Sequence, residues 1–247
     1  MALKKQSSDA ADAVLKKKST PTSKTTSKSP SKSISKPTLR LEKNLLKKHE
    51  SLVALDEVGR GSAAGPVAVG AVLLNPSLSK PPSGLNDSKK LSPLVRENLV
   101  SQIRSWCPSS VGYASCEEVD EWGMTTALTI AARRALDLLN PNPGIVLLDG
   151  SYDWINNDSL LKPGFLYDLP KLEVITIVKG DAKCLSIAAA SIVAKVERDS
   201  LMQELSKDFP NYGWDSNKGY LSQKHLAALR EFGFSKHHRM SWDYPLD

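Results

Sequence analysis

Three short apolar runs in this chain of 247 residues lead into acidic side chains, and these runs constrain its fold more than any other feature. Short runs rich in Leu, Ile and Val are typical of buried strands, and the second and third runs predict interior parallel strands. Groups at the carboxyl ends of strands meet in one crevice of an open α/β sheet. The sequence therefore predicts a site formed by the acids that follow the runs: Asp56 and Glu57 after residues 52–55, Asp149 after residues 145–148, and Asp181 after residues 174–178.

Asp56 and Glu57 need a partner if the strand end is buried, because unpaired ionised carboxylates are costly away from water. Mg²⁺ prefers carboxylate oxygen and retains water. Two such ions about 3.5 to 4 Å apart can activate a water and stabilise the leaving oxygen of a phosphodiester. Adjacent strand residues point to opposite faces, so both acids serve one site only if the strand twists or ends there.

Gly59, Arg60 and Gly61 follow the acidic pair almost at once. Glycine allows a tight turn and a close approach of the backbone to a ligand, and the planar guanidinium group suits phosphate. Acids and a phosphate contact within six residues indicate metal-assisted phosphodiester chemistry. Without further motifs, a solvated acidic pair before an ordinary glycine turn would be the better interpretation.

Further elements are predicted around these strands. Small residues join the first strand to a second one, which indicates a hairpin. Ser92 before Pro93 predicts a helix start, and Ser115 with Glu118 has the spacing of a capping box that opens one long helix. The predicted elements are a strand at 66–74, a helix from 93 to about 104, a strand at 111–114, a helix from 116 that stops at 140–141, and a helix from about 183 to 206.

The N-terminal region differs in composition from the rest. Residues 1–50 carry 13 Lys and Arg and four acids, a net charge of +9, whereas the whole chain carries +6, so the remainder carries −3. From Lys16 to Lys36 the chain is almost wholly Lys, Ser, Thr and Pro, and it cannot bury enough surface to offset its entropy. We therefore predict a disordered basic tail over residues 1–48 and a folded domain over residues 49–247. The tail is either a nucleic-acid tether or a solvated arm without a specific role.

Targeting and membrane segments are not expected. A secretory signal needs an apolar core, and a transit peptide would usually be richer in Arg and poorer in acids. The longest later apolar stretch, Ile187–Ala194, is far shorter than the ~20 residues that span a bilayer. The three cysteines show no paired spacing, which argues against a disulfide framework or a zinc site and for a reducing cytosol. We expect a soluble, cytoplasmic protein.

Several unrelated motifs occur in a fixed order along the chain. They are Asp-Glu-Val-Gly-Arg-Gly at 56–61, Asp-Ser-Lys-Lys-Leu-Ser at 87–92, Asp-Gly at 149–150, Lys-Gly-Asp at 179–181, a segment at 186–199 that ends in Lys-Val-Glu-Arg-Asp, and Asn-Lys-Gly-Tyr at 217–220 with His225 behind it. Such a set is far more specific than any single motif. With it, the chain resembles the type 2 ribonucleases H, specifically bacterial ribonuclease HII, from about residue 52 to residue 242.

The resemblance implies a ribonuclease H-like α/β fold, with a mixed five-stranded sheet flanked by helices and a small helical C-terminal part. It implies an endoribonuclease that hydrolyses the RNA strand of RNA/DNA hybrids. It also implies cleavage 5′ to a ribonucleotide embedded in duplex DNA, with two metal ions, Mg²⁺ or Mn²⁺, and with 3′-hydroxyl and 5′-phosphate ends. We expect these nucleic acids as partners, no membrane, and a monomer.

The same resemblance implies roles for single residues. These are catalysis and metal binding for Asp56, Glu57, Asp149 and Asp181, reading of the ribose 2′-hydroxyl for Gly59, Arg60 and Gly61, packing at the RNA-to-DNA junction for Tyr220, and substrate binding for Lys89. Two alternatives remain at this point. Tyr220 could be an ordinary half-buried aromatic, and Lys89 could be a solvated loop charge.

The chain departs from the family pattern at three places. Ser62-Ala63 stands where the family often has Pro-Leu, Ser151 stands where Asn is frequent, and the segment between Asp149 and Asp181 is long. These departures bear on loop shape more than on chemistry.

Some charged and imidazole side chains have no settled role in the sequence. Lys90, Lys195 and Arg198 are either solvated or in contact with phosphate. Asp199, one turn after Lys195, is expected in a helix ion pair. The pair at 237–238 is expected in surface or junction packing and not in a metal site.

Two other functions compete with this interpretation. A different nuclease or a recombinase of the same broad fold would share the carboxylates but would not need the glycine-flanked loop at 59–61. A non-catalytic nucleic-acid-binding protein would act through its basic tail, but the acidic set argues against it.

Overall fold

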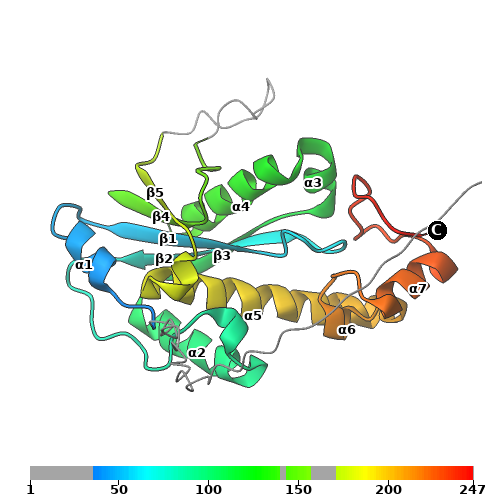
Figure 1. Cartoon of the computed structure of the whole chain (residues 1–247), viewed down its shortest axis with the longest axis horizontal. Helices are drawn as coiled ribbons and strands as arrows, with labels where there is room; N and C mark the ends of the chain where they lie inside the picture. The colour runs from blue at the N-terminus through cyan, green and yellow to red at the C-terminus, as the bar shows by residue number, and fades with distance from the viewer. Residues whose placement is uncertain (1–35, 140–142, 157–170, 247) are drawn as a thin grey trace, which may run out of the picture. The chain divides into compact units, whose positions relative to one another are not determined.

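The computed structural model describes residues 36–139, 143–156 and 171–246. The central element is one five-stranded sheet in the order β3-β2-β1-β4-β5 (Figure 1). β1 pairs antiparallel with β2 and β2 with β3, whereas β1, β4 and β5 run parallel. The strands are β1 Leu52–Val58, β2 Val67–Leu74, β3 Ser109–Ala114, β4 Ile145–Asp149 and β5 Val174–Ile177. The predicted hairpin and the mixed α/β sheet are therefore confirmed.

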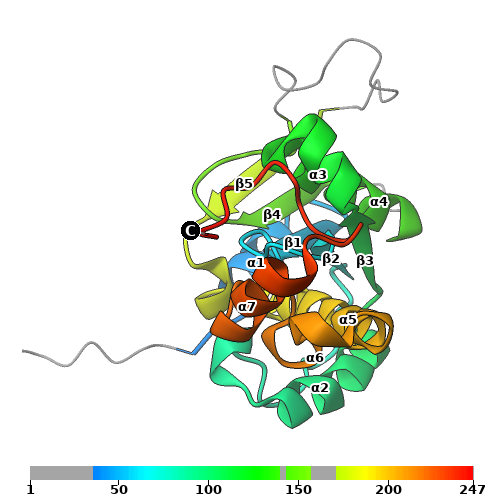
Figure 2. The same ribbon diagram turned by 90° about the vertical axis from the view of Figure 1, so that its right-hand side faces the viewer.

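Helices cover both faces of the sheet. In Figures 1 and 2, α3 and α4 lie on one face, α1, α2 and α5 lie on the other, and α6 and α7 form the C-terminal part. The α-helices are α1 Arg40–Leu45, α2 Pro93–Trp106, α3 Cys116–Trp122, α4 Met124–Leu139, α5 Leu185–Asp208, α6 Trp214–Asn217 and α7 Gln223–Phe232, and the short 3-10 helices are η1 Ser88–Lys90, η3 Gly180–Ala182 and η4 Pro210–Tyr212. Within the described ranges, no helix has the length and apolar character needed to cross a bilayer.

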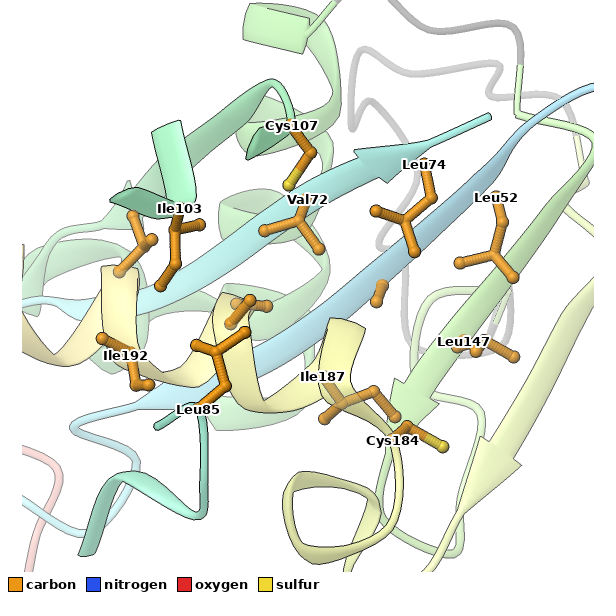
Figure 3. Close-up of a cluster of buried hydrophobic side chains, with 14 of the residues drawn as sticks. Leu52, Val72, Leu74, Leu85, Ile103, Cys107, Leu147, Cys184, Ile187 and Ile192 are labelled. Atoms are coloured by element: carbon orange, nitrogen blue, oxygen red, sulfur yellow. The ribbon is translucent and has the colours of Figure 1, made fainter. Parts of the chain in front are cut away.

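Alternation along β1 divides the core into two layers. Leu52 and Ala54 pack in the cluster shared with α2 and α5, part of which is shown in Figure 3. Val53 and Leu55 pack in the cluster beneath α4. All four side chains are fully buried, and burial of each Leu or Val stabilises the fold by about 1.5–3 kcal/mol. This register fixes the direction of the acids that follow in the strand.

Three sequence predictions about elements were wrong in detail. β1 continues to Val58, so Asp56 and Glu57 lie inside the strand and not after it. β5 is an edge strand with half-buried residues and not an interior one. The expected single helix from 116 is divided, because Gly123 takes a φ of 78° between α3 and α4. The capping box of Ser115 and Glu118 is present at the start of α3.

The N-terminal boundary also differs from the prediction. α1 begins at Arg40, and Leu39 and Leu46 on either side of it are buried in the main core. Thr38 donates its N–H to the carbonyl of Lys183 at 3.0 Å and accepts from the N–H of Leu185 at 3.2 Å. The folded unit therefore starts well before residue 49, because these apolar side chains find partners distant in sequence. The predicted disorder of the remaining tail, residues 1–35, lies outside the described residues.

Glu42 connects α1 to the start of α5. Its side chain is fully buried, and its Oε1 accepts hydrogen bonds from the Ser186 N–H at 3.0 Å and the Ser186 hydroxyl at 2.8 Å. Burial raises the pKa of Glu42, and the hydrogen bonds from Ser186 oppose this rise. A carboxylate at this position caps the N-terminal turn of α5, where N–H groups lack helical partners.

Removal of residues 1–48 should lower the melting temperature relative to removal of residues 1–35. The longer deletion exposes the sites of Leu39 and Leu46, and the lost burial corresponds to a shift on the order of 10 °C for a domain of this size. Thermal denaturation of the two truncated proteins side by side isolates the contribution of residues 36–48. Equal melting temperatures would show that α1 is not part of the stable fold.

Candidate active site

Asp56 and Asp149 lie at corresponding positions of two neighbouring strands. Leu55 of β1 pairs with Leu148 of β4 in parallel register, and each acid is the next residue of its strand. Alternation places Asp56 on the face of Ala54, the face covered by α5. The parallel register thus brings two carboxylates together without any loop contribution.

One pocket contains most of the predicted site residues. Its lining consists of Asp56, Glu57, Val58, Gly59, Arg60, Gly61, Ser88, Lys89, Arg96, Asp149, Ser191, Lys195 and Tyr220. Glu57 reaches it although alternation assigns this residue to the other face, because β1 ends one residue later at Val58. The condition that the sequence sets for both acids to serve one site is therefore met.

Asp181 approaches the same acids from η3 but does not line the pocket. It is 6% exposed, and its Oδ2 lies 3.8 Å from the Lys89 Nζ. The preceding residue, Gly180, donates its N–H to Asp149 Oδ1 at 2.6 Å, which fixes η3 against the end of β4. The charge of Asp181 acts on Asp56, as the shift of the Asp56 pKa shows.

Burial and mutual repulsion shift the titration of this cluster. Burial raises the pKa of Asp56 well above its usual value, the charges of Glu57, Asp149 and Asp181 raise it further, and a hydrogen bond from Ser191 opposes the rise. Burial likewise raises the pKa of Glu57 against the opposing charge of Arg60. The pKa of Asp181 is raised by burial and by nearby acids, against the opposing charge of Lys89. The cluster therefore holds more negative charge than its neighbours neutralise, and a bound cation would relieve this excess.

The donor set fits a hard divalent cation, although the oxygens are not gathered around one point. Among the described residues, no three His, Cys, Asp or Glu side chains converge into a preformed metal-binding group. The acids are instead held separately, Asp149 by the Gly180 N–H, Asp181 by Lys89, and Glu57 by Arg60 with its Nη1 at 3.6 Å. Carboxylate oxygens without soft ligands are the donors that Mg²⁺ and Mn²⁺ prefer.

The two glycines of the 59–61 loop serve different purposes. Gly59 has a φ of 82°, and a Cβ there would overlap the guanidinium group of Arg198. Gly61 has no left-handed φ, and a Cβ there would lie 3.8 Å from the Cε1 of Tyr220. Gly59 thus allows the left-handed backbone and the close approach of Arg198. Gly61 leaves space between the loop and the exposed ring of Tyr220.

Comparison with known proteins assigns the chain to a family. The family model described as Ribonuclease HII matches residues 53–244. The chain belongs to the ribonuclease HII family. It is 44% identical over 194 residues to a ribonuclease HII of Streptomyces coelicolor, covering 78% of this chain and 77% of that protein. It is also 44% identical over 207 residues to a ribonuclease HII of Jannaschia sp., covering 83% of this chain and 94% of that protein.

Solved structures show the same fold. The ribonuclease H2 of Pyrococcus horikoshii matches with a TM-score of 0.59 and 27% identity, covering 78% of this chain and 94% of that one. The ribonuclease HII in the PCNA complex of Archaeoglobus fulgidus matches with a TM-score of 0.58 and 27% identity, covering 77% and 93%. The ribonuclease H-like fold is confirmed, and membership of the ribonuclease HII family makes this chain a ribonuclease H that acts on RNA/DNA hybrids.

The structure places the remaining charged residues of the ribonuclease HII motifs. Lys195 lines the pocket and pairs with Asp199 at 2.7 Å, so the predicted helix ion pair is confirmed. Arg198, in contrast, is fully buried and is not a solvated charge. Lys90 pairs with Asp87 at 3.8 Å. Lys89 is mostly exposed. Burial alone would lower its pKa, but the charges of Asp181, Asp56, Asp87 and Asp149 together outweigh that effect and raise the pKa.

The histidines of the C-terminal part belong to packing. His238 is buried, and its Nε2 lies 3.0 Å from the Nε2 of His225. Both rings contact Tyr212 edge-on, and burial lowers the pKa of His238 to about 4. His238 is therefore a buried packing residue and not a surface one.

Sequence reasoning missed three polar residues that line the pocket. The hydroxyls of Ser88 and Ser191 lie 2.9 Å apart and connect η1 to α5 beside Asp56. Ser88 lies in the motif at 87–92 and Ser191 in the motif at 186–199, so these motifs could have indicated both residues. Arg96 of α2 binds the carbonyl of Ser88 at 2.9 Å through its Nη1, and no motif marked it.

Proposed function

We propose that this ribonuclease H cleaves the RNA strand of hybrids and also nicks duplex DNA 5′ to a single embedded ribonucleotide. The observation that carries the proposal is one pocket shared by the acids of β1 and β4, the 59–61 loop and Tyr220. The acids supply phosphodiester chemistry, and the loop and the ring supply a surface beside it that can examine one sugar and one base pair.

Asp56, Glu57, Asp149 and Asp181 would hold two divalent cations, Mg²⁺ or Mn²⁺. When bound, the ions would activate a water and stabilise the leaving 3′-oxygen, which yields 3′-hydroxyl and 5′-phosphate ends. The described pocket lining contains no His or Cys, and its two serines are hydrogen-bonded to each other. A side-chain nucleophile is not required, because a water activated by bound metal would attack the phosphodiester.

Positive side chains around the acids would hold the phosphates on either side of the cleaved bond. Arg60, Lys89, Arg96 and Lys195 all line the pocket. The ion pair between Lys89 and Asp181 is long, at 3.8 Å, and its lysine side chain is exposed, so it is a weak contact that phosphate can replace. Lys89 is the proposed substrate contact of this group.

Tyr220→Ala should impair the lone-ribonucleotide substrate more than a continuous hybrid. The ring is 41% exposed beside Gly61, and loss of one stacking surface costs about 1–3 kcal/mol, or roughly 5- to 150-fold. A long hybrid can bind in many positions along its length, whereas a duplex with a single ribonucleotide can be cleaved from one position only. The measurement is kcat/KM on both substrates, with Phe232→Ala as the control for loss of an exposed ring. Equal losses on the two substrates would refute the junction role of Tyr220.

The test of the proposed function is to map the ends of the cut. A DNA duplex with one ribonucleotide should yield a nick on its 5′ side with an extendable 3′-hydroxyl end. A nick on the 3′ side, or a 2′,3′-cyclic phosphate end, would indicate a different chemistry.

A further inference from the structure

Arg239 is a fully buried arginine whose side-chain hydrogen bonds within the described chain all go to backbone carbonyls of the 59–65 segment. Its Nη2 donates to Gly59 at 2.8 Å and to Gly65 at 3.0 Å, and its Nη1 donates to Arg60 at 3.0 Å. Burial lowers its pKa to about 10, and the charge of Arg198 adds to this effect. The side chain is nevertheless charged at neutral pH, and its planar fork matches several carbonyls at once.

The contacts of Arg239 determine where the N–H groups of the loop point. In a trans peptide the carbonyl of one residue and the N–H of the next lie on opposite sides, and the described chain has no cis peptide. Since the carbonyls of Gly59 and Arg60 face Arg239, the N–H groups of Arg60 and Gly61 face away from it. No acceptor within the described chain takes a hydrogen bond from either N–H. Both residues line the catalytic pocket.

We propose that Arg239 is a positioning residue for ribose selection. It holds two carbonyls inward, so that the N–H groups of Arg60 and Gly61 are presented to a 2′-hydroxyl oxygen in the pocket. This inference rests on the proposed function of the 59–61 loop. A site with fixed donors discriminates strongly against a sugar without the hydroxyl, because the donors are then left unpaired.

The backbone around Arg239 fixes its side chain against the loop. The Arg239 N–H donates to the carbonyl of Ala63 at 2.9 Å, and the Gly65 N–H donates to the carbonyl of His237 at 2.8 Å. Ala64 and His238 form an antiparallel bridge between these two bonds. Residues 237–239 thus pair with residues 63–65. At the other end of the 59–65 segment, the guanidinium group of Arg239 binds the carbonyls of Gly59 and Arg60.

Arg198 is linked to the carbonyl of Gly59 through Ser62. Its Nη2 donates to the Ser62 hydroxyl at 2.6 Å, and that hydroxyl donates to the carbonyl of Gly59 at 2.8 Å. Its Nη1 donates to the carbonyl of Lys218 at 2.9 Å, next to the turn that carries Tyr220. Ser62 therefore offers a way to weaken the hold on Gly59 while Arg239 stays in place.

The test compares Arg239→Lys with the unmodified protein on two duplexes that differ by one 2′-hydroxyl. Lys keeps the charge but cannot bind the three carbonyls as a fork. KM for the ribonucleotide duplex should rise about tenfold, on the order of one or two lost hydrogen bonds, and the Ki of the all-DNA duplex as competitor should stay unchanged. Arg230→Lys is the matched control, because Arg230 also donates to two carbonyls, those of Pro245 and Leu246, away from the pocket.

A Ki that rises by the same factor as KM would overturn the inference, since a merely structural arginine affects both duplexes alike. An unmodified protein that binds both duplexes equally would instead refute the proposed function of the loop. If Arg239→Lys lowers the melting temperature strongly, Ser62→Ala is the deciding variant. A rise in KM smaller than tenfold, with an unchanged Ki, supports the inference. An unchanged ratio of KM to Ki overturns it.

Discussion

Asp56→Asn and Asp149→Asn are each expected to lower the rate of hybrid cleavage by about 10³-fold or more. Charge stabilisation by a bound metal is worth several kcal/mol, and each 1.36 kcal/mol is a factor of ten in rate. Asn retains the size of Asp but supplies a neutral ligand. Single-turnover cleavage of an RNA/DNA hybrid with Mg²⁺ as the only metal measures the loss. Asp137→Asn, on the exposed surface of α4, is the matched control.

Thermal stability separates loss of catalysis from loss of fold in these variants. Because burial and neighbouring acids raise the pKa of Asp56, its ionisation opposes folding. This cost grows as the pH rises above the usual pKa of the carboxyl and is complete above the raised pKa. Asp56→Asn should therefore melt at a higher temperature than the unmodified protein at neutral pH without metal. Near-normal cleavage by either acid variant would contradict the assignment of the site.

Gly59→Ala is expected to reduce both stability and cleavage, the latter by about 100-fold or more. The left-handed backbone costs about 1–2 kcal/mol for a residue with a Cβ, and this Cβ would also overlap Arg198. Displacement of Arg198 frees the carbonyls that it holds around the loop. A shift of about 1 Å in a catalytic site can cost 10²-fold in rate.

Gly61 provides the contrast within the same loop. Gly61→Ala should fold normally, because its Cβ would meet only the Tyr220 ring at ordinary van der Waals distance. Gly61→Val should keep the melting temperature but fill the space beside Tyr220, and cleavage of all ribose-containing substrates should fall. Melting temperature and kcat/KM for the three glycine variants test this difference. A normal melting temperature for Gly59→Ala, or normal cleavage by Gly61→Val, would contradict the roles assigned to the two glycines.

The sequence predicts the part of the site that strand geometry determines. Asp56 and Asp149 follow apolar runs, and parallel pairing of those runs is enough to bring them together. The length of β1 was less predictable, because Glu57 is compatible with either a strand or a turn. Gly123 lies between α3 and α4, and the helical spacing of apolar residues alone does not mark a break at this position.

Contacts between distant segments could not be read from local patterns. Leu39 and Glu42 follow a Lys-rich stretch whose composition predicts disorder, yet they pack against the core and Ser186. Arg198 lies on a helix whose pattern does not show whether it faces solvent. The acceptors of Arg239 lie about 180 positions earlier in the chain. No spacing rule connects residues so far apart.

The central claim is metal-dependent hydrolysis directed by a ribose. Its most direct test is the cleavage rate of one DNA duplex with a single ribonucleotide and of the same duplex with deoxyribose at that position, each with Mg²⁺, with Mn²⁺ and with chelator. The account predicts one nick, 5′ to the ribonucleotide, only when a divalent metal is present. Cleavage of the all-DNA duplex, or cleavage that persists in chelator, would contradict it.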